Sequence, residues 1–165
     1  MSRAFVKEDA RSEAELVPPR APLPEGVPNL VTPRGWRLLH EERDAMNADR
    51  TRLDTAGEPV DALEERLEAL LARIASAQVT PAGDCDGVVR FGATVDVDVL
   101  GGSQPATQRL SIVGVDEADP MAGRIAFVSP IGAALLGARV GDEVALDGAN
   151  GRRRWRVRAI VEPPG

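Results

Sequence analysis

Three carboxylates stand close together in the second half of the chain, at Asp116, Glu117 and Asp119 in the stretch "DEADP". Grouped carboxylates can move protons or bind a hard cation such as Mg²⁺ through oxygen. Their setting favours a simpler interpretation, because they stand between two predicted strands and Asp119-Pro120 is typical of a turn. Carboxylates in such a turn are expected to stay solvated. The residues alone leave two alternatives, a functional group or an ordinary polar turn, and favour the turn.

A second acidic group, formed by Asp54, Glu58 and Asp61, surrounds the stretch "TAGEPVD". One alternative is a metal-binding tip that offers carboxylate oxygens to Mg²⁺. The other alternative is electrostatic. Gly57 is expected to end one helix and Pro59 to open the next. Glu58 and Asp61 would then flank a helix N-terminus, where negative charge is favoured by about 0.3–1 kcal/mol. The pattern favours the electrostatic alternative.

The composition excludes several other classes of site. The 165 residues contain one His and one Cys, too few for a disulfide framework or for a zinc site built from this chain alone. The formal net charge of −6 argues against a general nucleic-acid coat. No apolar run approaches the ~20 residues of a membrane span, and the start lacks the apolar stretch of a signal peptide. We therefore expect a cytoplasmic protein with no membrane contact.

The elements that position these residues divide the chain into four predicted segments. Residues 1–31 are expected to form a Pro-rich, disordered tail, because the prolines of "PPRAPLPEGVPN" exclude a helix. Residues 32–79 are expected to form an antiparallel helical hairpin, which Thr32 begins as an N-cap before a proline. Apolar residues recur in steps of three and four along its second arm, as in a short coiled coil. A linker at 80–87 and a domain at 88–165 follow.

The segment 88–165 is predicted to be an α+β domain, an antiparallel sheet with one short helix. The period of two in "VVRFGATVDVDV" indicates a half-buried strand, and "QRLSIVGV", "GRIAFVS", "DEVALD" and "RRRWRVRAIV" indicate four more. The helix begins with Ser129 as its cap and Pro130 in its first turn, and it closes at Gly137. Asn150-Gly151 predicts a hairpin turn.

The last predicted strand carries a row of arginines. Alternation places four of them on one face, Arg152, Arg154, Arg156 and Arg158. Arg153, Trp155 and Val157 fall on the other face, and we expect Trp155 in the core. The arginine row suits either a contact with an acidic surface or phosphate, or a solvated face whose side-chain stems cover apolar neighbours. The pattern favours the solvated face.

The order of these parts resembles the Gre transcript-cleavage factors of bacterial RNA polymerase, the GreA/GreB family. The resemblance is carried by "LVTPRGWRLLHEE", "FGATV", "IVGVDEADP" and "RIAFVSPIGAALLGARVGDEV", and it extends from Leu30 to about Val161. It implies an FKBP-like C-terminal domain that docks, as a monomer, on the rim of the polymerase secondary channel. It also implies a hairpin that enters this channel, with an acidic tip that helps the polymerase to bind a second Mg²⁺.

The same resemblance assigns the "DEADP" turn and the helix that follows it to docking on the polymerase. The implied docking residues come from these two places: Asp116, Glu117, Asp119, Pro120, Ser129, Pro130, Leu135 and Leu136. One of the two leucines is a candidate apolar contact, and at least one is expected in the sheet core. The resemblance implies no catalytic residue, no cofactor and no metal of the chain's own, because the polymerase supplies the rest of the active site.

The hairpin departs from the family. "RTRLDTAGEPVDALEERL" joins the arms without the tip motif of longer members, and a loss of about three turns per arm leaves the tip ~16 Å short. Catalytic carboxylates must be placed far more precisely than this. The length of the hairpin is closer to that of Rnk-like members. The resemblance of this chain to those members implies that it binds polymerase without stimulating cleavage. We expect the chain to regulate elongation without efficient transcript cleavage.

Three alternatives remain open. The first is an active cleavage-stimulating factor, in which Asp54, Glu58 or Asp61 helps to bind the polymerase Mg²⁺ and the tip reaches the 3′ end of the nascent RNA. The second is a prolyl isomerase, which the scarcity of aromatic residues in the sheet domain disfavours. The third is a module for a partner other than polymerase.

Overall fold

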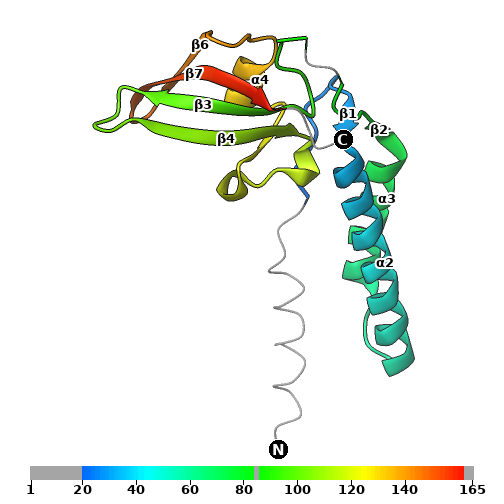
Figure 1. Ribbon diagram of the computed structural model, residues 1–165. Helices are drawn as coiled ribbons and strands as arrows, with labels where there is room; N and C mark the ends of the chain where they lie inside the picture. Colours follow the sequence, from blue (N-terminus) through cyan, green and yellow to red (C-terminus); the bar gives the residue numbers. More distant parts are fainter. Residues whose placement is uncertain (1–19, 84–85, 162–165) are drawn as a thin grey trace, which may run out of the picture. The chain divides into compact units, whose positions relative to one another are not determined.

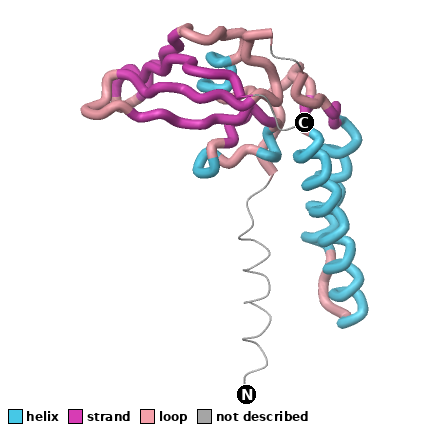
Figure 2. The backbone as a smooth tube through the Cα atoms, viewed as in Figure 1, coloured by secondary structure: helices cyan, strands magenta, loops and turns pink. Residues whose placement is uncertain are grey.

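The computed structural model describes residues 20–83 and 86–161, and these fall into two compact units. One unit contains the described residues up to Pro22 together with Leu38–Ser76. The other contains Leu23–Arg37 and the described residues from Ala77 onward. Most of the predicted tail, residues 1–19, lies outside the described residues. The units differ in secondary structure, helical in the first and mainly strand in the second (Figure 1 and Figure 2).

The helical unit consists of most of α2 (Pro33–Ala56) and of α3 (Asp61–Ser76). The predicted break between them is confirmed, because Gly57 adopts φ +69° and its N–H donates to the carbonyl of Asp54. α3 starts at Asp61, two residues after the predicted opening at Pro59. The buried apolar residues of this unit come from both helices: Leu39 and Met46 from α2, and Leu67 and Leu70 from α3. No described helix combines the length and the apolar character needed to cross a membrane.

A short parallel strand pair begins the second unit. β1 (Asn29–Val31) pairs with β2 (Ala77–Val79), and Asn29 and Val31 are both buried. The sequence analysis placed residues 29–31 in the tail and 77–79 in the hairpin. Neither segment has a signal of its own, because three residues are too few for a periodic pattern and their pairing joins distant parts of the chain.

The main sheet has five strands in the order β5-β4-β3-β7-β6. Their bounds are Thr94–Leu100 for β3, Ala106–Val113 for β4, Arg124–Ala126 for β5, Glu143–Gly148 for β6 and Gly151–Val161 for β7. The predicted hairpin turn before Gly151 is confirmed, since β6 and β7 pair up to Gly148 and Gly151. The prediction of a wholly antiparallel sheet is wrong, because β5 pairs with β4 in parallel. The chain crosses over between these strands through two 3₁₀ turns and re-enters in the same direction.

The core of this unit lies between one face of the sheet and α4 (Pro130–Leu135) (Figure 1). The predicted alternation is confirmed in β3, where Val95 and Val97 are fully buried while Asp96 is not. Burying side chains of this size contributes about 1.5–3 kcal/mol each. Ser129 caps α4 as predicted, because its hydroxyl accepts a hydrogen bond from the N–H of Gly132 at 3.2 Å.

We expect Gly132→Ala to destabilise the sheet unit by about 1–3 kcal/mol, because overpacking forces the backbone to shift. A Cβ at this position would lie 2.2 Å from the carbonyl oxygen of Ala126 and 3.0 Å from the Ser129 hydroxyl. Urea unfolding of the full chain measures the change. Gly83→Ala is the matched control, because a Cβ there meets nothing within 4 Å. Equal stability of the two variants would contradict the tight contact between α4 and β5.

Candidate functional site

The "DEADP" stretch forms the crossover from β4 to β5. Asp116 and Glu117 lie in the first 3₁₀ turn, η1 (Val115–Glu117), and Pro120 begins the second, η2 (Pro120–Ala122). The three carboxylates have different surroundings, since Glu117 is buried while Asp116 and Asp119 are half-buried. The prediction that all three stay solvated is therefore wrong for Glu117.

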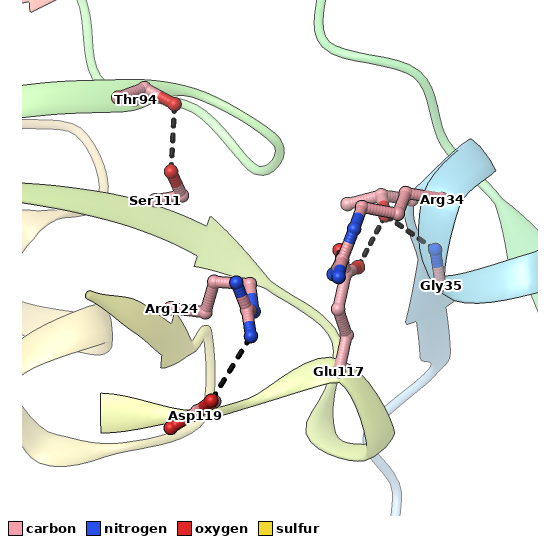
Figure 3. A network of polar contacts seen from close by, with 8 residues as sticks. Arg34, Gly35, Thr94, Ser111, Glu117, Asp119 and Arg124 are labelled. Atoms are coloured by element: carbon pink, nitrogen blue, oxygen red, sulfur yellow. Dashed lines mark hydrogen bonds and ion pairs between the residues drawn. The ribbon is translucent and has the colours of Figure 1, made fainter. Parts of the chain in front are cut away.

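Glu117 is held by two residues at the start of α2. Its carboxylate accepts hydrogen bonds from the Thr32 hydroxyl and from the guanidinium of Arg34, the latter at 2.9 Å (Figure 3). The Thr32 hydroxyl also accepts from the N–H of Gly35, which confirms Thr32 as the helix cap. α2 has no acidic residue in its own first turn, so Glu117 supplies the negative charge that a helix N-terminus favours. Its side chain, only 4% exposed, links the crossover to the helix start.

Asp119 fixes the second turn. Its carboxylate pairs with Arg124 at 3.1 Å, and the backbones of the two residues exchange hydrogen bonds of 2.9 and 3.0 Å (Figure 3). Gly123 closes the turn with φ +75°, and a Cβ there would lie 2.5 Å from the carbonyl oxygen of Arg109. This narrow, braced turn presents Pro120 and Met121 to solvent, and Met121 is 97% exposed.

The predicted helix contributes fewer surface residues than the sequence analysis implied. Leu135 is completely buried and Leu136 packs partly against the core, which confirms that at least one leucine is internal. The hydroxyl of Ser129 is used within the cap and donates to the carbonyl of Ala126 at 2.7 Å. Pro130 is exposed at the start of the helix. Leu135 is thus not accessible as an apolar contact.

A groove of about 1010 Å³ brings the two predicted stretches together within the sheet unit. Pro120 and Met121 line it from η2, and Pro130 lines it from the start of α4. Its apolar side chains include Leu110, Ile125, Ile131, Leu146 and Trp155. The sequence analysis missed Met121, because a lone apolar residue in a turn forms no pattern. It placed Trp155 in the core, which is confirmed, and the same ring also lines the groove.

The acidic residues between the helices do not converge on one point. A small hollow of about 290 Å³ is lined by residues of both helices and the turn between them: Arg50, Thr51, Asp54, Val60 and Glu64. Glu58 and Asp61 do not line it, and the sequence analysis missed Glu64. Asp61 and Glu64 occupy the first turn of α3, where helix polarity favours acids. Among the described residues, no group of three or more His, Cys, Asp or Glu is placed to hold a metal ion.

The outer face of the sheet confirms the solvated interpretation of the arginine row. Each of the four arginines lies within ion-pair distance of an acid on β3 or β6: Arg152 of Asp147, Arg154 and Arg156 of Glu143, and Arg158 of Asp98. On β4, Arg109 pairs with Asp96 at 2.8 Å. The hydrogen bond from Arg109 outweighs the effect of burial and lowers the pKa of Asp96 below its ordinary value.

Comparison with known proteins places this helical pair and braced sheet domain in a family. A model of the C-terminal region of GreA/GreB transcription elongation factors matches residues 84–162. A transcription elongation factor GreA of Ralstonia nicotianae is 41% identical over 116 residues, which cover 69% of this chain and 70% of that protein. A GreA of Rhodospirillum rubrum is 33% identical over 153 residues, 92% of this chain and 91% of that protein. The chain belongs to the GreA/GreB family.

Two solved structures align with most of the described chain. A GreA/GreB factor from Nitrosomonas europaea aligns with 81% of this chain and 98% of its own length, at 22% identity and a TM-score of 0.42. The GreA factor homolog 1 (Gfh1) of Thermus thermophilus aligns with 81% of this chain and 98% of its own length, at 23% identity and a TM-score of 0.39.

We expect Glu117→Gln to lower the free energy of unfolding by about 1–3 kcal/mol, because the amide loses the charge that Arg34 and the helix start require. Urea unfolding measures the loss. Asp119→Asn is the matched control, since its ion pair with Arg124 is more exposed and is worth about 1 kcal/mol or less. A loss no larger for Glu117→Gln than for Asp119→Asn would contradict the role given to the buried carboxylate.

Removing the Arg109 side chain should change the acid sensitivity of the sheet. Because the pKa of Asp96 is lowered in the folded state, the pair stabilises the fold above the unfolded-state pKa. This stabilisation is lost as the pH falls through the folded-state pKa. We expect Arg109→Gln to raise the pKa of Asp96 and to weaken the loss of stability in acid.

NMR titration of the Asp96 carboxyl carbon, together with unfolding at pH 7 and pH 3, measures both effects. Asp96→Asn in the Arg109→Gln background is the control, and it should not weaken the pH dependence of the stability any further. An unchanged Asp96 pKa in Arg109→Gln would show that another group is responsible.

Proposed function

We propose that this chain is a transcription elongation factor that binds bacterial RNA polymerase at the rim of the secondary channel through the groove of its sheet domain. The proposal is carried by the braced turn that presents Pro120 and Met121 beside Pro130 at one apolar groove. Exposed apolar side chains gathered at the edge of a groove are typical of interaction surfaces. The stretch also lies within the region matched by the family model.

Of the predicted docking residues, those on the surface make the contact and the others hold them in place. Pro120 and Pro130 border the groove, with Met121 as an addition. Glu117, Ser129 and Leu135 act from inside the fold, through the helix start, the α4 cap and the core. Asp119 braces η2 while remaining partly exposed. Asp116 and Leu136 are half-buried and do not line the groove.

We propose further that α2 and α3 form a short coiled-coil hairpin that occupies the channel entrance without efficient transcript cleavage. α2 has 24 residues and α3 has 16, which correspond to ~36 Å and ~24 Å of helix. These lengths support the proposal that the arms lack the extra turns expected of longer family members. In this role the chain acts as a monomer in the cytoplasm, with an FKBP-like domain as its anchor, and any Mg²⁺ at the tip belongs to the polymerase.

The alternative is active stimulation of cleavage by the tip. Asp54 favours it, because this carboxylate lines the hollow between the helices together with Glu64. In this alternative Asp54, Glu58 or Asp61 adds an oxygen ligand to the polymerase Mg²⁺ and the tip reaches the nascent RNA 3′ end. Asp54→Ala and Asp61→Ala would then abolish the stimulation.

RNA cleavage in backtracked polymerase complexes distinguishes the two functions. We expect this chain alone to leave the cleavage rate unchanged, because its tip falls short of the active site. Added in excess to a longer family member, it should suppress that factor's stimulation by competing for the same rim. Cleavage stimulated by the chain alone would overturn the main proposal in favour of the alternative.

Two variants test whether the competition depends on the groove. Met121→Glu places a charge at the apolar edge and should abolish the suppression. Val140→Glu is the matched control, because Val140 is also an exposed apolar residue, at 54%, and does not line the groove. Equal suppression by wild type and Met121→Glu would exclude the groove as the docking surface. Absence of binding by the wild type would exclude polymerase as the partner.

A further inference from the structure

Arg153 differs from the other arginines of β7. It lies opposite Leu146 in the register of β6 and β7, and its side chain lines the groove rather than the outer face. Arg152, Arg154, Arg156 and Arg158 each have an acid within 4.0 Å. No such pair is present for Arg153 among the described residues. The strand thus directs one uncompensated cation into the groove.

The other charges that line the groove are already balanced. Arg109 is engaged by Asp96, and Asp147 lies 3.9 Å from Arg152. Arg153 is therefore the excess charge, and it stands beside the apolar side chains of Leu146 and Trp155. A guanidinium near apolar surface gains more from a carboxylate than one in open water, because a bound partner excludes solvent from the pair.

We infer that the groove binds an amphipathic protein segment, with an apolar side chain against Trp155 and Met121 and an Asp or Glu carboxylate paired with Arg153. The inference rests on the proposed function and specifies the chemistry of the polymerase segment at this groove. The planar guanidinium selects a carboxylate, with which it forms two parallel hydrogen bonds. The apolar walls select side chains rather than a hydrated phosphate backbone, so a protein segment fits better than nucleic acid.

The test measures the affinity of the full chain for core RNA polymerase without nucleic acid, at two salt concentrations. We expect Arg153→Gln to weaken binding about tenfold, because the partner carboxylate loses its counter-charge. Arg153→Glu should weaken it further, and raising the salt should narrow the difference from wild type. Arg154→Gln is the matched control, one residue along on the opposite face and paired with Glu143, and should stay within about twofold.

Each outcome has one meaning. Affinity unchanged in Arg153→Gln and Arg153→Glu, with wild type bound, overturns the inference and leaves the proposed function standing. An effect of Arg153→Gln seen only when RNA or DNA is present assigns Arg153 to phosphate and also overturns it. Failure of wild type to bind overturns the proposed function itself. Thermal unfolding of each variant shows whether weaker binding reflects a lost contact or a lost fold. Arg153→Lys should bind more tightly than Arg153→Gln but more weakly than the wild type.

Discussion

The buried carboxylate of Glu117 is the constraint on which the proposed docking surface depends. A carboxylate removed from water costs several kcal/mol unless it is paired and hydrogen-bonded. Glu117 finds its partners at Thr32 and Arg34, which precede it by 85 and 83 residues. The crossover between β4 and β5 therefore reaches its native form only together with the first turn of α2. Because η2 follows directly, the position of Pro120 is set by a contact far away in sequence.

Close backbone packing adds a second constraint on the same crossover. Gly35 and Gly114 stand where a Cβ would meet the Glu117 carboxylate at 2.8 Å and the carbonyl oxygen of Leu30 at 2.5 Å. With Gly123 against Arg109, these contacts leave the crossover little freedom to move. A turn braced in this way loses little conformational entropy when a partner binds. The exposed Met121 side chain then supplies an adaptable apolar contact on a rigid base.

The features that depend on residues close together in the sequence could be predicted, whereas those that depend on contacts between distant residues could not. The Thr32 and Ser129 caps and the two faces of β7 follow from residues within a few positions of one another, so the sequence alone predicted them. The burial of Glu117 depends on residues more than 80 positions away, and an isolated "DEADP" looks like any polar turn. The parallel pairing of β5 depends on how the chain crosses over. Met121 and Arg153 could not be recognised as candidate contact residues from the sequence, because their neighbours in the groove come from other parts of the chain.

The two faces of β7 differ in how their arginines are paired: those on the outer face are neutralised by acids, whereas Arg153 on the groove face is available to a partner. On the outer face, arginines and acids alternate across β4, β3, β7 and β6, and exposed pairs of this kind add little stability. Their effect is to cancel charge locally, so a strongly arginine-rich strand offers no open row of cations to phosphate. On the groove face, Arg153 has no acidic partner among the described residues. For the docking role proposed above, a groove with one uncompensated cation among apolar walls provides both contact area and a charge that fixes the register of the partner.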